Sequence, residues 1–92
     1  MPINRIKHKG LKELFEHGVT AKIEAMLQPN ALLILDHLDA ITGLEDCRGV
    51  KDFHALKGRR KEQYSMHVSG NWCIIFTFAD GMVEVLNLED YH

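Results

Sequence analysis

The strongest constraint on the fold comes from the second half of the chain, where apolar segments alternate with short turn sequences. Residues 64–68, 72–78 and 82–88 are rich in β-branched and aromatic residues, a composition typical of strands. Asp80-Gly81 separates the last two segments, and this dipeptide favours a β-hairpin because both central residues of the tight turn need a positive φ. We therefore predict a meander of antiparallel strands over this half.

The first half follows the helical repeat instead. Apolar residues at 11, 14 and 15 mark one face of a short amphipathic helix, and Gly18 is suited to end it. Thr20 is suited to cap a second short helix carrying Ile23, Met26 and Leu27. Pro29 fits the first turn of a third helix, which we expect from about Asn30 to Ile41 with Gly43 closing it.

Helices followed by strands predict an α+β domain. Residues 3–8 are predicted to add a short first strand, so the fold is a small antiparallel β-sheet packed by two to three N-terminal helices. The 92 residues, 46% of them hydrophobic and 26% charged, suit one globular domain over residues 1–92. The helices should cover one face of the sheet and leave the other face for function.

The distribution of charge is more informative than its total. The net charge of -2 argues against a general nucleic-acid binder. Residues 48–67, however, hold six basic against two acidic side chains, whereas residues 79–92 hold four acidic and no basic ones. Residues 5–12 carry Arg5, Lys7, Lys9 and Lys12 without any acid. If they share a face, the two basic groups form an RNA footprint; the lysines of residues 5–12 equally suit the solvated side of a helix.

The cysteine content and the absence of long apolar runs indicate the cellular setting. Cys47 and Cys73 are too few for the disulfide framework of a small secreted domain, and no charged-then-apolar leader opens the chain. The longest apolar run, residues 31–35, is far shorter than a membrane helix requires. We expect a protein of the reducing cytoplasm with no membrane span.

A basic loop is the first candidate for chemistry. His54 and Lys57 lie three residues apart at the end of a predicted strand, and Arg59, Arg60 and Lys61 follow in a loop containing Gly58. Guanidinium and ammonium groups neutralise phosphate oxygens, and a glycine allows close approach of the backbone. The alternative is a solvated basic turn.

The last three residues of the sequence are the second candidate. Asp90 offers a carboxylate that can orient the imidazole of His92, and Tyr91 offers a ring on which a base can stack. A polar terminal stub is the alternative. An antiparallel sheet can bring the end of its last strand beside an earlier strand, which links this group to His54 and Lys57.

Neither a metal site nor a cysteine nucleophile is predicted. The possible ligands show no C-x-x-C or H-x-x-x-H spacing; they are His54, His67, His92, Cys47 and Cys73. Cys73 falls within an apolar strand, where a thiol usually packs as an inert group. We expect no metal and no other cofactor.

Several motifs together resemble the HigB toxins of bacterial toxin-antitoxin modules, in the RelE-like superfamily. The resemblance runs over nearly the whole chain and is weakest between residues 21 and 50. Its motifs are Lys7-His8-Lys9-Gly10-Leu11-Lys12, Leu14-Phe15-Glu16 with Gly18, Leu56-Lys57-Gly58, Asn71-Trp72 and Asp90-Tyr91-His92. Leu-Lys-Gly alone is common, but these motifs in this order and spacing are specific.

The resemblance implies a fold, an activity and a site. The family fold is a small antiparallel sheet packed by N-terminal helices. Its activity is metal-independent, ribosome-dependent cleavage of mRNA in the A site, and its partners are a HigA-like helix-turn-helix antitoxin, in a hetero-oligomeric complex, and the 70S ribosome with its 16S RNA. Carried onto matching positions, the implied active-site residues are His54, Lys57, Asp90, Tyr91 and His92.

The chain departs from the family at one position. The family pattern reads Asn-Trp-Arg, and the arginine is an implied phosphate contact, whereas this chain has Cys73. A thiol offers no guanidinium fork, so the rate can fall by several powers of ten. Either Arg59 or Arg60 takes over this contact, or the chain is a weakened toxin.

Three functions therefore stay open. The first is a ribosome-dependent mRNA endoribonuclease neutralised by an antitoxin. The second is a binding module that keeps the fold and the RNA affinity but has lost turnover through Cys73. The third is a gyrase inhibitor like the ParE branch of the superfamily, which the Asp90-Tyr91-His92 ending disfavours.

Overall fold

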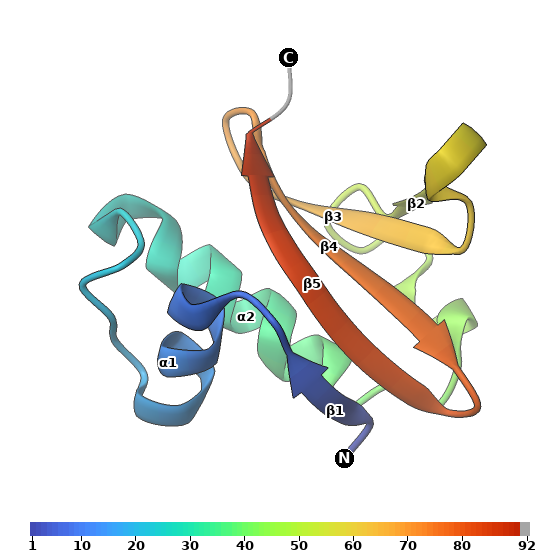
Figure 1. Ribbon diagram of the computed structural model, residues 1–92, viewed down its shortest axis with the longest axis horizontal. Helices are drawn as coiled ribbons and strands as arrows, with labels where there is room; N and C mark the ends of the chain where they lie inside the picture. The colour runs from blue at the N-terminus through green and yellow to red at the C-terminus, as the bar shows by residue number, and fades with distance from the viewer. Residues whose placement is uncertain (91–92) are drawn as a thin grey trace.

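The computed structural model describes residues 1–90 and contains two helices and five strands (Figure 1). Three short 3-10 helices, η1 to η3, lie in the connections. In chain order the elements are β1 (Ile3–Ile6), α1 (Lys9–His17), η1 (Ala25–Leu27), α2 (Gln28–Leu38), η2 (Leu44–Cys47), β2 (His54–Ala55), η3 (Gly58–Arg60), β3 (Gln63–Ser69), β4 (Trp72–Ala79) and β5 (Met82–Asp90).

All five strands form one sheet in the order β1-β5-β4-β3-β2. The predicted meander is confirmed, since β3, β4 and β5 pair antiparallel in sequence. Asp80 and Gly81 have φ values of 54° and 77° and connect the paired residues Ala79 and Met82, so the predicted hairpin is also confirmed. Only β1 departs from the antiparallel pattern, because it pairs parallel with β5.

Both helices lie on the same side of the sheet, as predicted (Figure 1). Their buried apolar side chains, Leu11 and Leu14 from α1 and Ile34, Leu35 and Leu38 from α2, form one core with the strands. The strands contribute alternate residues to this core: Met66, Val68, Ile74, Phe76, Val83, Val85 and Leu88. The α+β fold class is therefore confirmed.

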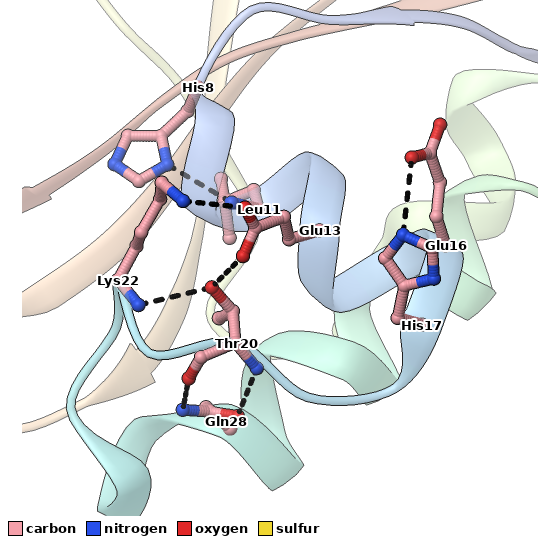
Figure 2. Close-up of polar contacts among 8 residues, drawn as sticks. All are labelled: His8, Leu11, Glu13, Glu16, His17, Thr20, Lys22 and Gln28. Atoms are coloured by element: carbon pink, nitrogen blue, oxygen red, sulfur yellow. Dashed lines mark hydrogen bonds and ion pairs between the residues drawn. The ribbon is translucent and has the colours of Figure 1, made fainter.

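The ends of α1 follow from local side-chain chemistry. His8 is the N-cap, and its Nδ1 accepts a hydrogen bond from Leu11 N at 3.1 Å (Figure 2). Burial lowers the pKa of His8, which favours the neutral ring that this bond requires. Gly18 ends the helix with φ 80°, and its N–H donates to Leu14 O at 2.8 Å, as predicted.

The predicted second helix is wrong. Thr20 caps no helix: its hydroxyl donates to Glu13 Oε1 at 2.7 Å and accepts from Lys22 N at 3.0 Å (Figure 2). The side-chain amide of Gln28 bonds both the N–H and the carbonyl of Thr20. These bonds fix an irregular connection, and only η1 forms a helical turn there.

The third helix has the predicted type but different ends. It begins at Gln28, with Pro29 in its first turn as expected, and it ends at Leu38 instead of Ile41. Asp39 accepts a hydrogen bond from Ile3 N at 3.2 Å, which ties the end of α2 to β1. Ile41 is still buried, and Gly43 precedes η2 with an extended backbone, so it does not close α2.

One irregularity between β4 and β5 decides which side chains face each other. Phe76 pairs with Val85, and the next pair along is Ile75 with Asn87, so Leu86 is an extra residue in β5. This is a β-bulge. Beyond it, Cys73 pairs with Glu89 and Trp72 with Asp90.

Candidate active site

The face of the sheet opposite the helices carries a small cavity of about 160 Å³. Ser65, Cys73 and Ile75 are buried on this face, and they alternate along β3 and β4 with the core residues Met66 and Ile74. The full lining is His54, Leu56, Arg60, Ser65, Cys73, Ile75 and Glu89. The cavity therefore brings together side chains from β2, η3 and all three strands of the meander.

His54 lies at the mouth of this cavity on β2, the edge strand. It pairs with Ser65 of β3, and its exposed side chain has Nε2 3.2 Å from Ser65 Oγ. Its Nδ1 lies 3.0 Å from Asp52 O, and a carbonyl only accepts, so Nδ1 carries the proton in this bond. In that tautomer the neutral ring keeps the basic lone pair on Nε2.

Arg60 and Glu89 form a bidentate ion pair across the cavity wall. Nη1 of Arg60 donates to Oε1 of Glu89 at 2.9 Å, and Nη2 donates to Oε2 at 2.7 Å. The guanidinium lowers the pKa of Glu89 through these bonds, and the carboxylate raises the pKa of Arg60. The pair joins η3 to β5, so it holds the basic loop of residues 57–61 against the sheet.

Cys73 lies in the same wall and is 2% exposed. Burial raises the pKa of its thiol to about 11, with the Glu89 carboxylate adding to the shift. At neutral pH the group is therefore an uncharged thiol and not a nucleophilic thiolate. This agrees with the prediction that Cys73 is inert packing.

The other cations of the basic loop are exposed. Lys57 precedes η3, and Gly58 opens it with φ 67°, a conformation that favours glycine. Arg59 and Lys61 are not part of the cavity lining and are exposed as well. The structure thus separates Arg60, which is held at the cavity, from three cations that face solvent around it.

The terminal group is only partly described. Asp90 is exposed at the end of β5 and pairs with Trp72, whereas its neighbour Glu89 pairs with Cys73. Successive strand residues point to opposite faces, so it is Glu89, and not Asp90, that shares the cavity face. Tyr91 and His92 lie outside the described residues.

The N-terminal basic residues form a separate groove of about 550 Å³ between β1 and α1. Its lining includes all four predicted cations, Arg5, Lys7, Lys9 and Lys12, beside the apolar Ile3, Ile6 and Phe15. This groove lies at the β1 edge of the sheet, and the cavity lies toward the β2 edge. The two basic groups are therefore separate surfaces along the strand order.

Sequence reasoning missed two polar residues of the cavity, Ser65 and Glu89. Ser65 is a buried hydroxyl beside His54, and strand alternation from Met66 could have placed it there. Glu89 was hidden by the bulge at Leu86, because an uninterrupted hairpin would pair Cys73 with Leu88. Within residues 1–90, no group of three His, Cys, Asp or Glu side chains is arranged to hold a metal ion.

Comparison with known proteins decides the family. Residues 4–92 match the model of the HigB-like toxin family, described as RelE-like toxins of the type II toxin-antitoxin system HigB. The chain is also 41% identical over 91 residues to Endoribonuclease HigB from Proteus vulgaris, which covers 98% of this chain and 99% of that protein. The chain belongs to the HigB-like toxin family. The resemblance found in the sequence motifs is thereby confirmed.

Solved structures agree with the fold of this HigB-like toxin. The YoeB dimer from Staphylococcus aureus has a TM-score of 0.65 at 14% identity and covers 100% of this chain and 99% of its own. The YoeB/ParE toxin from Agrobacterium tumefaciens has a TM-score of 0.62 at 12% identity, covering 98% and 100%. At these identities the likeness concerns the fold. In the part of the HigB-like toxin that the structure describes, no helix is long and apolar enough to cross a membrane.

Proposed function

We propose that this HigB-like toxin is a ribosome-dependent endoribonuclease that cuts translated mRNA in the A site. The observation that carries the proposal is the cavity on the uncovered sheet face, which both His54 and the guanidinium of Arg60, paired with Glu89, line. The 41% identity to a protein named Endoribonuclease HigB, over nearly the whole chain, supports the same activity.

The proposed reaction is internal attack within the RNA. The ribose 2'-hydroxyl gives its proton to a base and bonds to phosphorus, and the bond from phosphorus to the 5'-oxygen breaks as an acid protonates that oxygen. The products are a 2',3'-cyclic phosphate and a 5'-hydroxyl. The extra charge on the phosphorane between these steps must be stabilised by cations. Because Arg and Lys side chains supply these cations, the proposed reaction requires no metal.

His54 suits one of the two proton transfers. Its Nδ1 contact with Asp52 O leaves Nε2 as the proton-accepting atom, and its exposure gives substrate access. From the family resemblance, His92 takes the other transfer, Asp90 orients an imidazole and Tyr91 holds a nucleobase. Lys57, three residues after His54, supplies charge at the phosphate.

The partners follow from the type II family, whose toxins act with an antitoxin. We propose that this antitoxin is HigA-like, with a helix-turn-helix, and that it forms a hetero-oligomeric complex with residues 1–92 as one toxin domain in the cytoplasm. Lys7, Lys9 and Lys12 in the β1–α1 groove, and Arg59, Arg60 and Lys61 around η3, would contact ribosomal 16S RNA and mRNA.

A second candidate function rests on Cys73. Its buried, uncharged thiol cannot replace the arginine of the family pattern, so a toxin that binds RNA and antitoxin without efficient turnover is the alternative. In that case the ribosome would be bound while its mRNA stayed intact.

Primer extension on a translated reporter mRNA after pulse induction tests the proposal. His92→Ala and Cys73→Arg are run beside the parent chain. Cuts by the parent that disappear in His92→Ala would support the nuclease. Cuts only in Cys73→Arg would favour the weakened module, and a DNA-damage response without mRNA cuts would favour a ParE-like gyrase inhibitor.

A further inference from the structure

We infer that Arg60 is the guanidinium that holds the scissile phosphate in this chain, and that Glu89 is the positioning residue that aims it. The inference rests on the proposed nuclease function. It gives Arg60 the phosphate contact that Cys73 cannot make, through a side chain that reaches the same cavity from a different element.

Arg60 lies in the position that this contact requires. Arg60 and Cys73 both line the cavity, and the positive charge of Arg60 partly offsets the rise in the pKa of the Cys73 thiol that burial causes. His54 lines the same cavity, so one small site holds both a proton-transfer group and a cation. The Arg60 guanidinium, which comes from η3, can therefore make the phosphate contact that an arginine at position 73 of β4 would make.

The side chain of Arg60 is also held in a fixed orientation. Glu89 holds Nη1 and Nη2 of Arg60, and Gln63 Oε1 accepts from its Nε at 3.3 Å. Glu89 is in turn held by Asn87 Nδ2 at 3.2 Å. A cation that is fixed before the substrate arrives needs no reorganisation during the reaction, which is the condition for strong charge stabilisation.

Arg60 also keeps hydrogen-bonding capacity for a phosphate. A guanidinium has five N–H groups, and contacts among residues 1–90 use three of them. One N–H on each of Nη1 and Nη2 is left for a phosphate oxygen. The Arg60 side chain is 43% exposed against 27% for Glu89, so the cation is more accessible than the carboxylate.

The test uses single-turnover cleavage of mRNA on programmed ribosomes with purified toxin. Arg60→Gln should lower the cleavage rate constant by about 10²–10³-fold, the usual effect of removing one charge-stabilising donor. Adding Cys73→Arg to Arg60→Gln should restore at least about tenfold, because a guanidinium then enters the cavity from β4. Glu89→Gln should lower the rate constant at saturating ribosome by less than Arg60→Gln and leave the half-saturating ribosome concentration little changed, as a positioning role requires.

Lys22→Gln is the matched control. It removes one cation and one ion pair, that with Glu13, on the helical side of the molecule, and it should cleave at the parent rate. Thermal unfolding of every variant checks the fold. Parent-rate cleavage by Arg60→Gln would overturn the inference, and so would a folded double variant no faster than Arg60→Gln.

A binding measurement separates this inference from the nuclease proposal. A trinucleotide with 2'-deoxyribose, which cannot be cut, is titrated while the NMR signal of the Arg60 Nε–H is followed. The signal should shift more than that of Arg59, and the shift should shrink in Glu89→Gln. A parent that never cuts mRNA but shows this shift refutes the nuclease and keeps the phosphate site, whereas an unmoved signal refutes the site.

Discussion

The two faces of the sheet differ in what their buried residues are. On the helix-covered face the strands bury apolar side chains such as Ile74, Phe76 and Val85 against α1 and α2. On the cavity face the buried residues include Ser65 and Cys73, with the Arg60–Glu89 pair above them. One sheet thus has a face that supplies stability and a face that holds polar groups in fixed positions, and substitutions should separate these two roles.

The largest expected effect is on the cavity face. His54→Ala should lower the mRNA cleavage rate by about 10²–10⁴-fold, because it removes a general acid or base. Its effect on unfolding should be small, since His54 is exposed. Single-turnover cleavage and urea unfolding of the same protein measure both. A loss of stability large enough to unfold the variant, and so to explain its loss of cleavage, would mean that the two faces are not functionally distinct.

The opposite pattern is expected for Leu35 of α2, which is fully buried in the core. Leu35→Ala should lower the free energy of unfolding by about 2–5 kcal/mol, because it removes apolar contacts and leaves a cavity. Cleavage per folded molecule should stay at the parent level. A specific loss of cleavage at a temperature where the variant is folded would show coupling between the faces.

An intermediate effect is expected at the β1–α1 groove, away from both the core and the cavity. Replacing Lys7, Lys9 and Lys12 with Gln should flatten the salt dependence of ribosome binding, lowering the slope of log K against log salt by roughly 2–3. The rate at saturating ribosome should not change. An unaltered slope would mean that the three lysines are solvated and do not contact ribosomal RNA.

The smallest expected effect is the contribution of the Arg60–Glu89 pair to stability. Arg60 lowers the folded-state pKa of Glu89 below its ordinary 4.5, so the pair stabilises the fold above that value, and this contribution is lost as pH falls through the lowered pKa. Because both side chains are partly exposed, its size should be at most about 1 kcal/mol. Urea unfolding of the parent and Arg60→Gln across acid pH should therefore converge at low pH. A difference that grows on acidification would contradict the sign.

Much of the fold could be predicted because local chemistry and tertiary structure agree there. Asp80-Gly81, Gly18 and Pro29 each have the backbone role that their residue type favours. The helix expected after Thr20 was wrong because the Thr20 hydroxyl contacts Glu13 and Lys22 instead of a helical N–H. The Lys22 N–H is a local partner, but Glu13 lies on α1, and this contact belongs to tertiary packing, which residue spacing does not encode.

The candidate site was likewise only partly predictable from the sequence. The basic loop pattern was enough to select His54 and Arg60, which both line the cavity, whereas Lys57 lies outside its lining. The partner of Arg60 was not predictable, since Glu89 faces Cys73 only because of the register change at Leu86. The groove cations were identified as one group, but their distance along the sheet from the basic turn required the order of all five strands.

The extra residue Leu86 shifts the register of residues 87–90 by one position relative to β4. Each following side chain keeps its identity and changes its face of the sheet. Pairing without the bulge would put Leu88 opposite Cys73 and turn Glu89 away from Arg60, and one residue inserted between Leu86 and Leu88 would do the same. Evolution of this strand is therefore constrained in its length as well as in its residues, and an insertion there should remove more activity than most substitutions.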